Sequence, residues 1–165
     1  MKGFTLIEAL VTIAIAGILI ALGLPSFTTL IKDRRLQGHQ EAFLGALVEA
    51  RSTALARQRR TVLCASADGA SCAASGSENW SSGWIVFVDN DADLVRDNGE
   101  ELVLVGGAAP PSVTLDTTLS TALTPLSFDS MGHSAASRQF VWCDDRGTSK
   151  CRNLNVMVTG MIRKS

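Results

Sequence analysis

The chain has 165 residues, which allows one modest globular domain beside a long apolar N-terminal stretch. Its formal net charge of -1 at pH 7 excludes a chain that is polycationic along its whole length for binding nucleic acid. Much of the hydrophobic content lies before Pro25, and the remainder has the Gly, Ser, Thr and Asp content of a soluble domain.

Residues 4–24 form an apolar run that carries a single charge, Glu8. About 20 helical residues cross the roughly 30 Å of a bilayer core, so the run predicts a membrane-spanning helix. The alternative is a removed secretory signal peptide. It is disfavoured because the acid lies near the start, no A-x-A site follows, and Pro25 leads into another helical pattern. A carboxylate in such a span is costly and indicates a function with a specific partner.

Residues 25–59 are predicted to continue the helix with an amphipathic pattern. Pro25 lacks an N–H, so we expect it to kink the helix rather than end it. Apolar residues then recur at helical spacing on one face, which we expect to carry the rest of the domain. They are Leu36, Phe43, Leu47, Ala50 and Ala54.

Residues 60–165 change to a period of two and predict short strands separated by Gly-, Ser- and Pro-containing segments. The expected strands are 61–66, 83–89, 101–105, 112–116, 126–130, 138–144 and 153–160. We find no internal repeat. The pattern predicts an α+β fold, in which a long N-terminal helix packs on one antiparallel sheet or on two.

The four cysteines are Cys64, Cys72, Cys143 and Cys151. Two short-range pairs, Cys64–Cys72 and Cys143–Cys151, have equal spacing and suit loops or hairpins in an oxidising compartment. Four cysteines allow three pairings, and the sequence does not choose between them. The rival is a zinc site of four thiolates, which lacks the close C-x-x-C pairs of zinc ribbons.

The segment "DNDADLVRDNGE" has the carboxylate spacing of a calcium-binding EF-hand loop. Leu94, however, occupies the position that needs Gly, and the flanks read as strands. We therefore favour a plain acidic hairpin, with metal binding as the weaker interpretation. The candidate calcium ligands are Asp89, Asp91, Asp93, Asp97 and Glu100.

Catalysis has little support. His39 lies in the predicted helix and His133 in a turn-like segment, and neither is tied to a nucleophile and an orienting acid. Phosphate-binding and dinucleotide fingerprints are missing. We therefore expect a protein that is not an enzyme and needs no cofactor.

The stretch "KGFTLIEALVTIAIAGILIALGLPSF" resembles the N-terminus of type IV prepilins and type II secretion pseudopilins. The resemblance implies that a prepilin peptidase cuts between Gly3 and Phe4 and that Phe4 is then N-methylated. Glu8 becomes the fifth residue of the mature chain, where the family has its Glu, and Pro25 matches the family's helix-kinking proline. Pairing of Glu8 with the Phe4 amine, within or between subunits, would relieve the cost of a carboxylate in low dielectric.

Further along, "EARSTALARQRRTVLC", "WSSGWIVFVDNDADLVRDNGEELVL" and "NLNVMVTGMIR" are similar to the GspH/FimT branch of this family. The resemblance implies four parts: a leader at 1–3, a transmembrane and filament-core helix at 4–24, an amphipathic helix at 25–59 and a periplasmic head at 60–165. It implies a minor pilin of a type IV pilus that helps to initiate and cap the filament. The alternative is a minor pseudopilin of a type II secretion system.

The same resemblance implies a cytoplasmic N-terminus in the bacterial inner membrane and a final position at the tip of a pilus or pseudopilus. Expected partners are other minor and major pilins, the prepilin peptidase, the inner-membrane assembly platform and the inner membrane itself. The family ends in Gly-Arg-x-Arg, where this chain has Met161 in place of the first Arg, and some FimT-like members bind DNA through basic residues near this end. Candidate DNA-binding residues are Arg57, Arg59, Arg60, Arg163 and Lys164.

Overall fold

The computed structural model describes residues 3–74, 76–117 and 125–165. It separates into two compact units, residues 1–35 and residues 36–165. One helix, α1 (Leu6–Arg57), contributes to both units and is not ended by Pro25. Within the parts of the chain that the structure describes, no helix combines the length and the apolarity that a membrane span requires.

Local hydrogen bonds explain where α1 begins and ends. The Thr5 hydroxyl accepts from the backbone N–H of Glu8 at 3.3 Å, as an N-cap does, and Glu8 places its negative charge in the first turn. At the other end Gln58 adopts a left-handed φ of 51°, and the N–H of Arg59 donates to the carbonyl of Ala54. This 6→1 bond is the signature of a Schellman termination.

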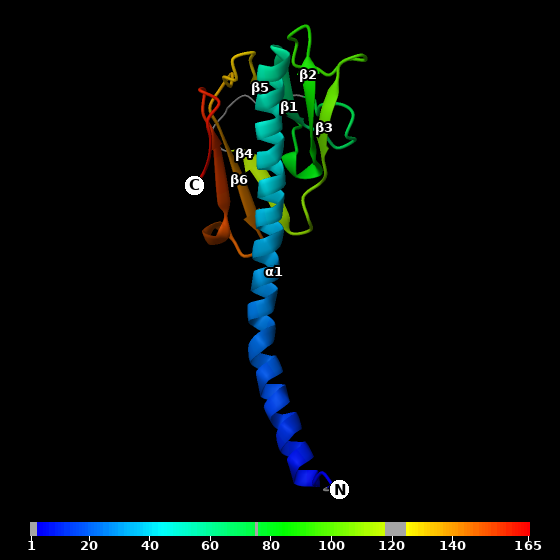
Figure 1. Cartoon of the computed structure of the whole chain (residues 1–165), viewed down its shortest axis with the longest axis vertical. Helices are drawn as coiled ribbons and strands as arrows, with labels where there is room; N and C mark the ends of the chain where they lie inside the picture. The colour runs from blue at the N-terminus through cyan, green and yellow to red at the C-terminus, as the bar shows by residue number, and fades with distance from the viewer. Residues whose placement is uncertain (1–2, 75, 118–124) are drawn as a thin grey trace. The chain divides into compact units, whose positions relative to one another are not determined.

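The head contains two four-stranded antiparallel sheets, consistent with the predicted fold class (Figure 1). The first sheet has the order β3-β2-β1-β5, and the second has the order β4-β6-β7-β8. The strands of the first sheet are β1 (Arg60–Ala65), β2 (Trp84–Asp89), β3 (Leu102–Gly106) and β5 (Leu126–Phe128). Those of the second are β4 (Val113–Thr117), β6 (Arg138–Asp144), β7 (Arg152–Val156) and β8 (Ile162–Lys164). Short 3-10 helices precede β2 and β7, at Trp80–Ser82 and Thr148–Lys150.

The second half of α1 packs on both sheets through the face that the apolar spacing predicts. Leu36, Phe43, Leu47, Ala50 and Ala54 are all fully buried. Phe43 lies at the centre of this packing. Its ring centroid is 4.9 Å from that of Trp84 and 5.3 Å from that of Trp142, and both pairs are edge-on. Such aromatic pairs add stabilisation beyond the apolar area that they bury. This cluster fixes the helix against the head.

Each of the seven expected strand segments contains a strand, but the last expected segment, 153–160, extends beyond the end of β7 at Val156. A turn at Val158–Gly160 reverses the chain after β7 and creates β8, which the sequence analysis did not separate. Gly160 has a φ of 75° and is buried so closely that an added Cβ would collide with the carbonyl oxygen of Gly132. Only glycine fits such a position without strain.

Candidate functional site

The first candidate site is the start of α1, in the unit of residues 1–35. Its large apolar side chains are exposed, with exposed fractions of 78% for Phe4, 82% for Leu6 and 72% for Ile7. The exposed apolar surface continues along the helix at Leu10, Val11, Ile13, Ile15, Ile18, Leu19, Ile20, Phe27 and Leu30. An apolar surface of this length is not stable against water, so lipid or other protein must cover it. Glu8 is exposed within the same surface.

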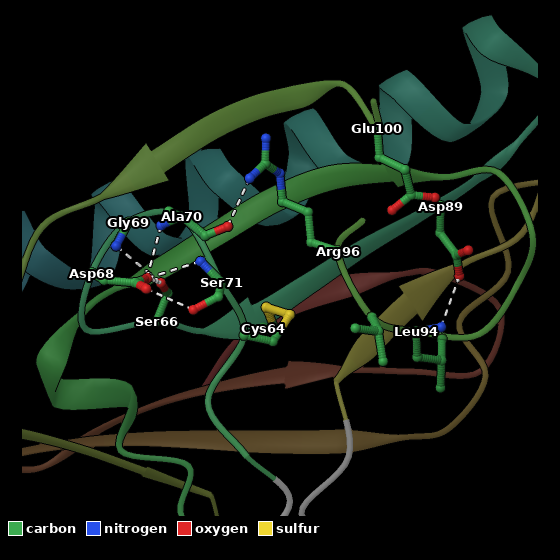
Figure 2. The surroundings of a disulfide bond; sticks show 12 residues. Cys64, Ser66, Asp68, Gly69, Ala70, Ser71, Asp89, Leu94, Arg96 and Glu100 are labelled. Atoms are coloured by element: carbon green, nitrogen blue, oxygen red, sulfur yellow. Dashed lines mark hydrogen bonds between the residues drawn. A yellow bond between two sulfur atoms is a disulfide. The ribbon is translucent and has the colours of Figure 1, made fainter. Parts of the chain in front are cut away.

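The second candidate site is a pair of loops on the outer face of the first sheet, shown in Figure 2. The structure joins Cys64 to Cys72, and it joins Cys143 of β6 to Cys151, which directly precedes β7. These are the two short-range pairs of equal spacing, one of the three pairings that the sequence left open. The Cys64–Cys72 bridge closes a loop over a small buried cluster of Val62, Ile85 and Phe87.

Asp68 organises this disulfide loop (Figure 2). One of its carboxylate oxygens accepts from the backbone N–H groups of Ala70 and Ser71, each at 2.8 Å, and from the Ser66 hydroxyl at 3.0 Å. The other oxygen accepts from the Ser71 hydroxyl at 2.6 Å. These bonds, led by the Ser71 hydroxyl, hold the pKa of Asp68 far below its usual range. The carboxylate therefore stays ionised and keeps the loop closed.

The loop between β2 and β3 lies beside the disulfide loop and is fastened to it. Arg96 donates to the carbonyl of Ala70 at 2.7 Å, and Leu94 packs against the small buried cluster (Figure 2). Leu94 has a φ of 68°, so a leucine makes the sharp turn for which the EF-hand pattern requires glycine. The loop joins two neighbouring strands and is a hairpin connection.

The carboxylates in this hairpin serve its backbone. Asp89 accepts from the N–H groups of Ala92 and Leu94, at 2.6 and 3.3 Å. Glu100 accepts from the N–H groups of Asn90 and Asp97, at 2.6 and 3.1 Å. Asp89, Asp91 and Asp93 each place one oxygen within 4.8 Å of the others, while Asp97 and Glu100 are not part of that group. Acidic groups that cap a loop in this way account for the sequence pattern without an ion.

The candidate DNA-binding cations are divided between two places. Arg57 pairs with Glu101 at 2.7 Å, and Arg60 donates to the carbonyl of Ala92 at 3.1 Å. Lys164 pairs with Glu41 at 3.6 Å. Arg59 and Arg163 are exposed, and neither forms an ion pair with any residue that the structure describes.

The distance between the two groups follows from α1. Glu41 and Arg57 are separated by 16 residues of one helix, which is about 24 Å at 1.5 Å per residue. Met161 precedes β8 and lines an apolar pocket with Ile162 and the α1 residues Val48 and Leu55. The cations form two separate groups rather than one basic band.

Two residues that the sequence analysis did not assign hold the head together. Arg51 of α1 donates from Nε to the carbonyl of Gly132 at 3.0 Å and from Nη2 to that of Thr159 at 3.4 Å, bridging two turns. His39 is buried and accepts from the indole Nε1 of Trp142 at 2.9 Å. A charged or titratable residue beside the apolar face of a helix is the only signal that the sequence offers for either role.

Two parts of the chain match known protein families. Residues 1–24 match the model described as the prokaryotic N-terminal methylation motif, and residues 39–160 match the model described as type II transport protein GspH. No curated protein sequence matches the chain.

Two solved structures are similar in fold. The type IV minor pilin FimU of Pseudomonas aeruginosa PAO1 aligns with a TM-score of 0.60 at 20% identity, covering 81% of this chain and 90% of FimU. The minor pseudopilin EpsH from the type 2 secretion system of Vibrio cholerae aligns with a TM-score of 0.54 at 10% identity, covering 78% of this chain and 93% of EpsH. The GspH model spans more than half of the chain and the pilin-like fold agrees with it, so the chain belongs to the GspH family.

Proposed function

We propose that the chain is a minor pilin of a type IV pilus, a subunit of low abundance that helps to initiate and cap the filament at or near its tip. The observation that carries this proposal is the exposed apolar surface that begins at Phe4, just before α1, and continues along that helix to Leu30. A surface of this kind needs lipid before assembly and neighbouring helices after it. A filament subunit is surrounded by lipid before assembly and by the helices of other subunits afterwards.

In this proposal a prepilin peptidase cuts between Gly3 and Phe4, and the new amine of Phe4 is methylated. Support comes from the match of residues 1–24 to the N-terminal methylation motif. Before assembly, the chain spans the inner membrane through residues 4–24. Residues 25–59 continue the helix, and the head, residues 60–165, lies in the periplasm. Two closed disulfides suit that oxidising compartment.

In this proposal, Glu8 sets the axial position at which an incoming subunit joins the filament. Its backbone N–H is bonded to Thr5, but its exposed side chain forms no hydrogen bond or ion pair within the part of the chain that the structure describes. A carboxylate in an apolar layer is strongly penalised unless an opposite charge is close. The Phe4 amine of a neighbouring subunit, with other pilins packed around it, is such a charge. Pairing favours one axial position of the incoming subunit.

The alternative is a minor pseudopilin of a type II secretion system, which uses the same helix chemistry. We favour the pilus because the paired cysteines suit a FimT/FimU-like head. Deletion of the gene distinguishes the two. Loss of surface pili with normal export of secreted enzymes supports the pilus, and the reverse result supports secretion.

A contribution to DNA binding is the second candidate function. Arg59 and Arg163 support it, because both cations are exposed and neither is neutralised by a carboxylate among the described residues. Phosphate contacts need only such charges and no base recognition. Pairing of Arg57 and Lys164 with acids, and the apolar side chain of Met161, limit the strength of this surface.

The filament proposal is tested by substitution of Glu8. Glu8→Gln removes the charge with little change of shape, and we expect the chain to remain in the membrane but to be lost from sheared filaments. Glu8→Asp keeps the charge and is the matched control, which we expect to retain part of the incorporation. Wild-type amounts of the Glu8→Gln chain in filaments would show that the charge has no part in assembly.

A further inference from the structure

We propose that Asn98 is a site of spontaneous deamidation, at which the hairpin between β2 and β3 acquires an isoaspartate or aspartate residue. Asn98 and Gly99 occupy the middle of a turn that is closed by the N–H of Glu100 donating to the carbonyl of Asp97 at 3.2 Å. Both residues are exposed. Asparagine is among the thermolabile residues of proteins, and an asparagine followed by glycine is the least hindered case.

The two groups that react are the Asn98 carboxamide and the peptide nitrogen of Gly99. Among the residues that the structure describes, none forms a hydrogen bond to the Asn98 carboxamide or to the N–H of Gly99. Gly99 has a φ of 108°, and an added Cβ would meet no atom within 4 Å. The peptide nitrogen can therefore turn toward the side chain without displacing a neighbour.

The reaction balances with water as its only co-reactant. The peptide nitrogen of Gly99 loses its proton to hydroxide and attacks Cγ of Asn98, forming a new C–N bond. The carboxamide nitrogen then leaves as ammonia, and a five-membered succinimide remains. Water opens this ring at either carbonyl. One product has an aspartate in place of Asn98, and the other has an isoaspartate whose main chain runs through the side-chain carbon.

The chain contains a matched case in which the same step is blocked. Asp68 is also followed by glycine, but the N–H of Gly69 donates to the Ser66 hydroxyl at 3.1 Å. Both carboxylate oxygens of Asp68 accept hydrogen bonds, which keep the group ionised and a poor target for attack. Among the described residues, the reacting groups of Asp68–Gly69 are therefore hydrogen-bonded, whereas those of Asn98–Gly99 are not.

The product changes a restrained part of the head. Isoaspartate lengthens the main chain between Asp97 and Glu100, and the bonds of Glu100 to the N–H groups of Asn90 and Asp97 depend on that length. Gly99 also lines a pocket with Arg57, Arg59 and Glu101, so a new carboxylate on the preceding residue adds negative charge near these arginines. Deamidation therefore loosens the hairpin and lowers the positive potential at the end of α1.

The experiment uses the full chain in detergent, incubated at mildly alkaline pH both folded and in denaturant. Peptide mapping by mass spectrometry follows each site, and transfer of a labelled methyl group by protein isoaspartate methyltransferase detects isoaspartate. For Asn98 we expect folded and denatured rates within about threefold of each other, because an unrestrained turn needs no opening step. Asn98→Gln should remove the signal.

Asp68→Asn is the matched variant, because it places a second Asn-Gly pair where the glycine N–H is held. In denaturant position 68 of this variant should react as fast as Asn98, whereas in the folded chain it should react at least about tenfold more slowly. The proposal is overturned if the folded chain protects Asn98 to the same degree, or if no isoaspartate forms at Asn98 while the denatured chain produces it.

Discussion

Trp142 donates its indole N–H to Nδ1 of His39 across 2.9 Å, and this bond joins α1 to the second sheet in the interior of the head. Because Nδ1 accepts, the imidazole is neutral and carries its proton on Nε2. Burial lowers the pKa of His39, and the nearby backbone of Gly107 acts in the opposite direction with a smaller effect. His39, one of two histidines in the chain, is thus a structural residue of the core.

We expect this bond to make stability depend on pH. The folded pKa of His39 lies below the ordinary value, so the unfolded state binds the proton more readily. Stability is therefore complete above about pH 6.5 and is lost as the pH falls below it. Denaturant unfolding at a series of pH values should show the loss in the wild type and a flatter profile in His39→Gln.

His39→Leu is the companion variant, because it leaves the indole N–H of Trp142 buried without an acceptor. We expect it to cost about 1–3 kcal/mol at neutral pH. Equal pH profiles for the wild type and His39→Gln would assign the acid sensitivity to other groups.

The two disulfides differ in what they protect, although each spans a sequence separation of 8. Loop length alone predicts the same contribution from both, about 2–3 kcal/mol in the chain-entropy model. Cys64 is almost fully buried over Val62, Ile85 and Phe87, whereas Cys143 and Cys151 are half-buried. Replacing Cys64 and Cys72 with serine should therefore destabilise the head more than the same change at Cys143 and Cys151.

Guanidinium unfolding of the two double variants measures this difference, after non-reducing peptide mapping has located the bridges in the wild type. A peptide linking Cys64 to Cys143 would contradict the pairing. Equal losses of stability in the two variants would show that the small cluster adds nothing beyond loop closure.

Any DNA binding should be weak, indifferent to base sequence and steeply reduced by salt. Arg59→Gln and Arg163→Gln should each weaken binding of the full chain to duplex DNA. Each should also lower the slope of log affinity against log salt by about one, because each removes one phosphate contact. Lys150→Gln, at an exposed cation outside both groups, is the control. Unchanged salt slopes in both arginine variants would exclude these residues as contacts.

The local parts of the fold could be predicted from the sequence. Alternation located seven strands, and helical spacing located the buried face of α1 from Leu36 to Ala54. The boundary between β7 and β8 could not be found, because apolar residues continue through the turn before Gly160.

Contacts between distant residues were beyond sequence reasoning. His39 and Trp142 are 103 residues apart, and nothing in either neighbourhood indicates that they bond. Leu94 appeared to disqualify the sharp turn of an acidic loop, yet it adopts a left-handed φ. Leu94 packs over the small cluster. Its own N–H donates to the Asp89 carboxylate, and the next N–H along the chain donates to the Asp93 carboxylate. These contacts hold Leu94 in the left-handed conformation. Long-range packing of this kind overrides local preference.

The central claim is that this chain is processed and assembled as a pilin, and the mature N-terminus tests it most directly. Protein purified from a bacterial host with a prepilin peptidase should be analysed by intact-mass and N-terminal peptide mass spectrometry. The account predicts a chain that begins at N-methylated Phe4 and retains Glu8 and the whole of α1. A mature chain that begins beyond Pro25, as after removal of a signal peptide, would contradict it.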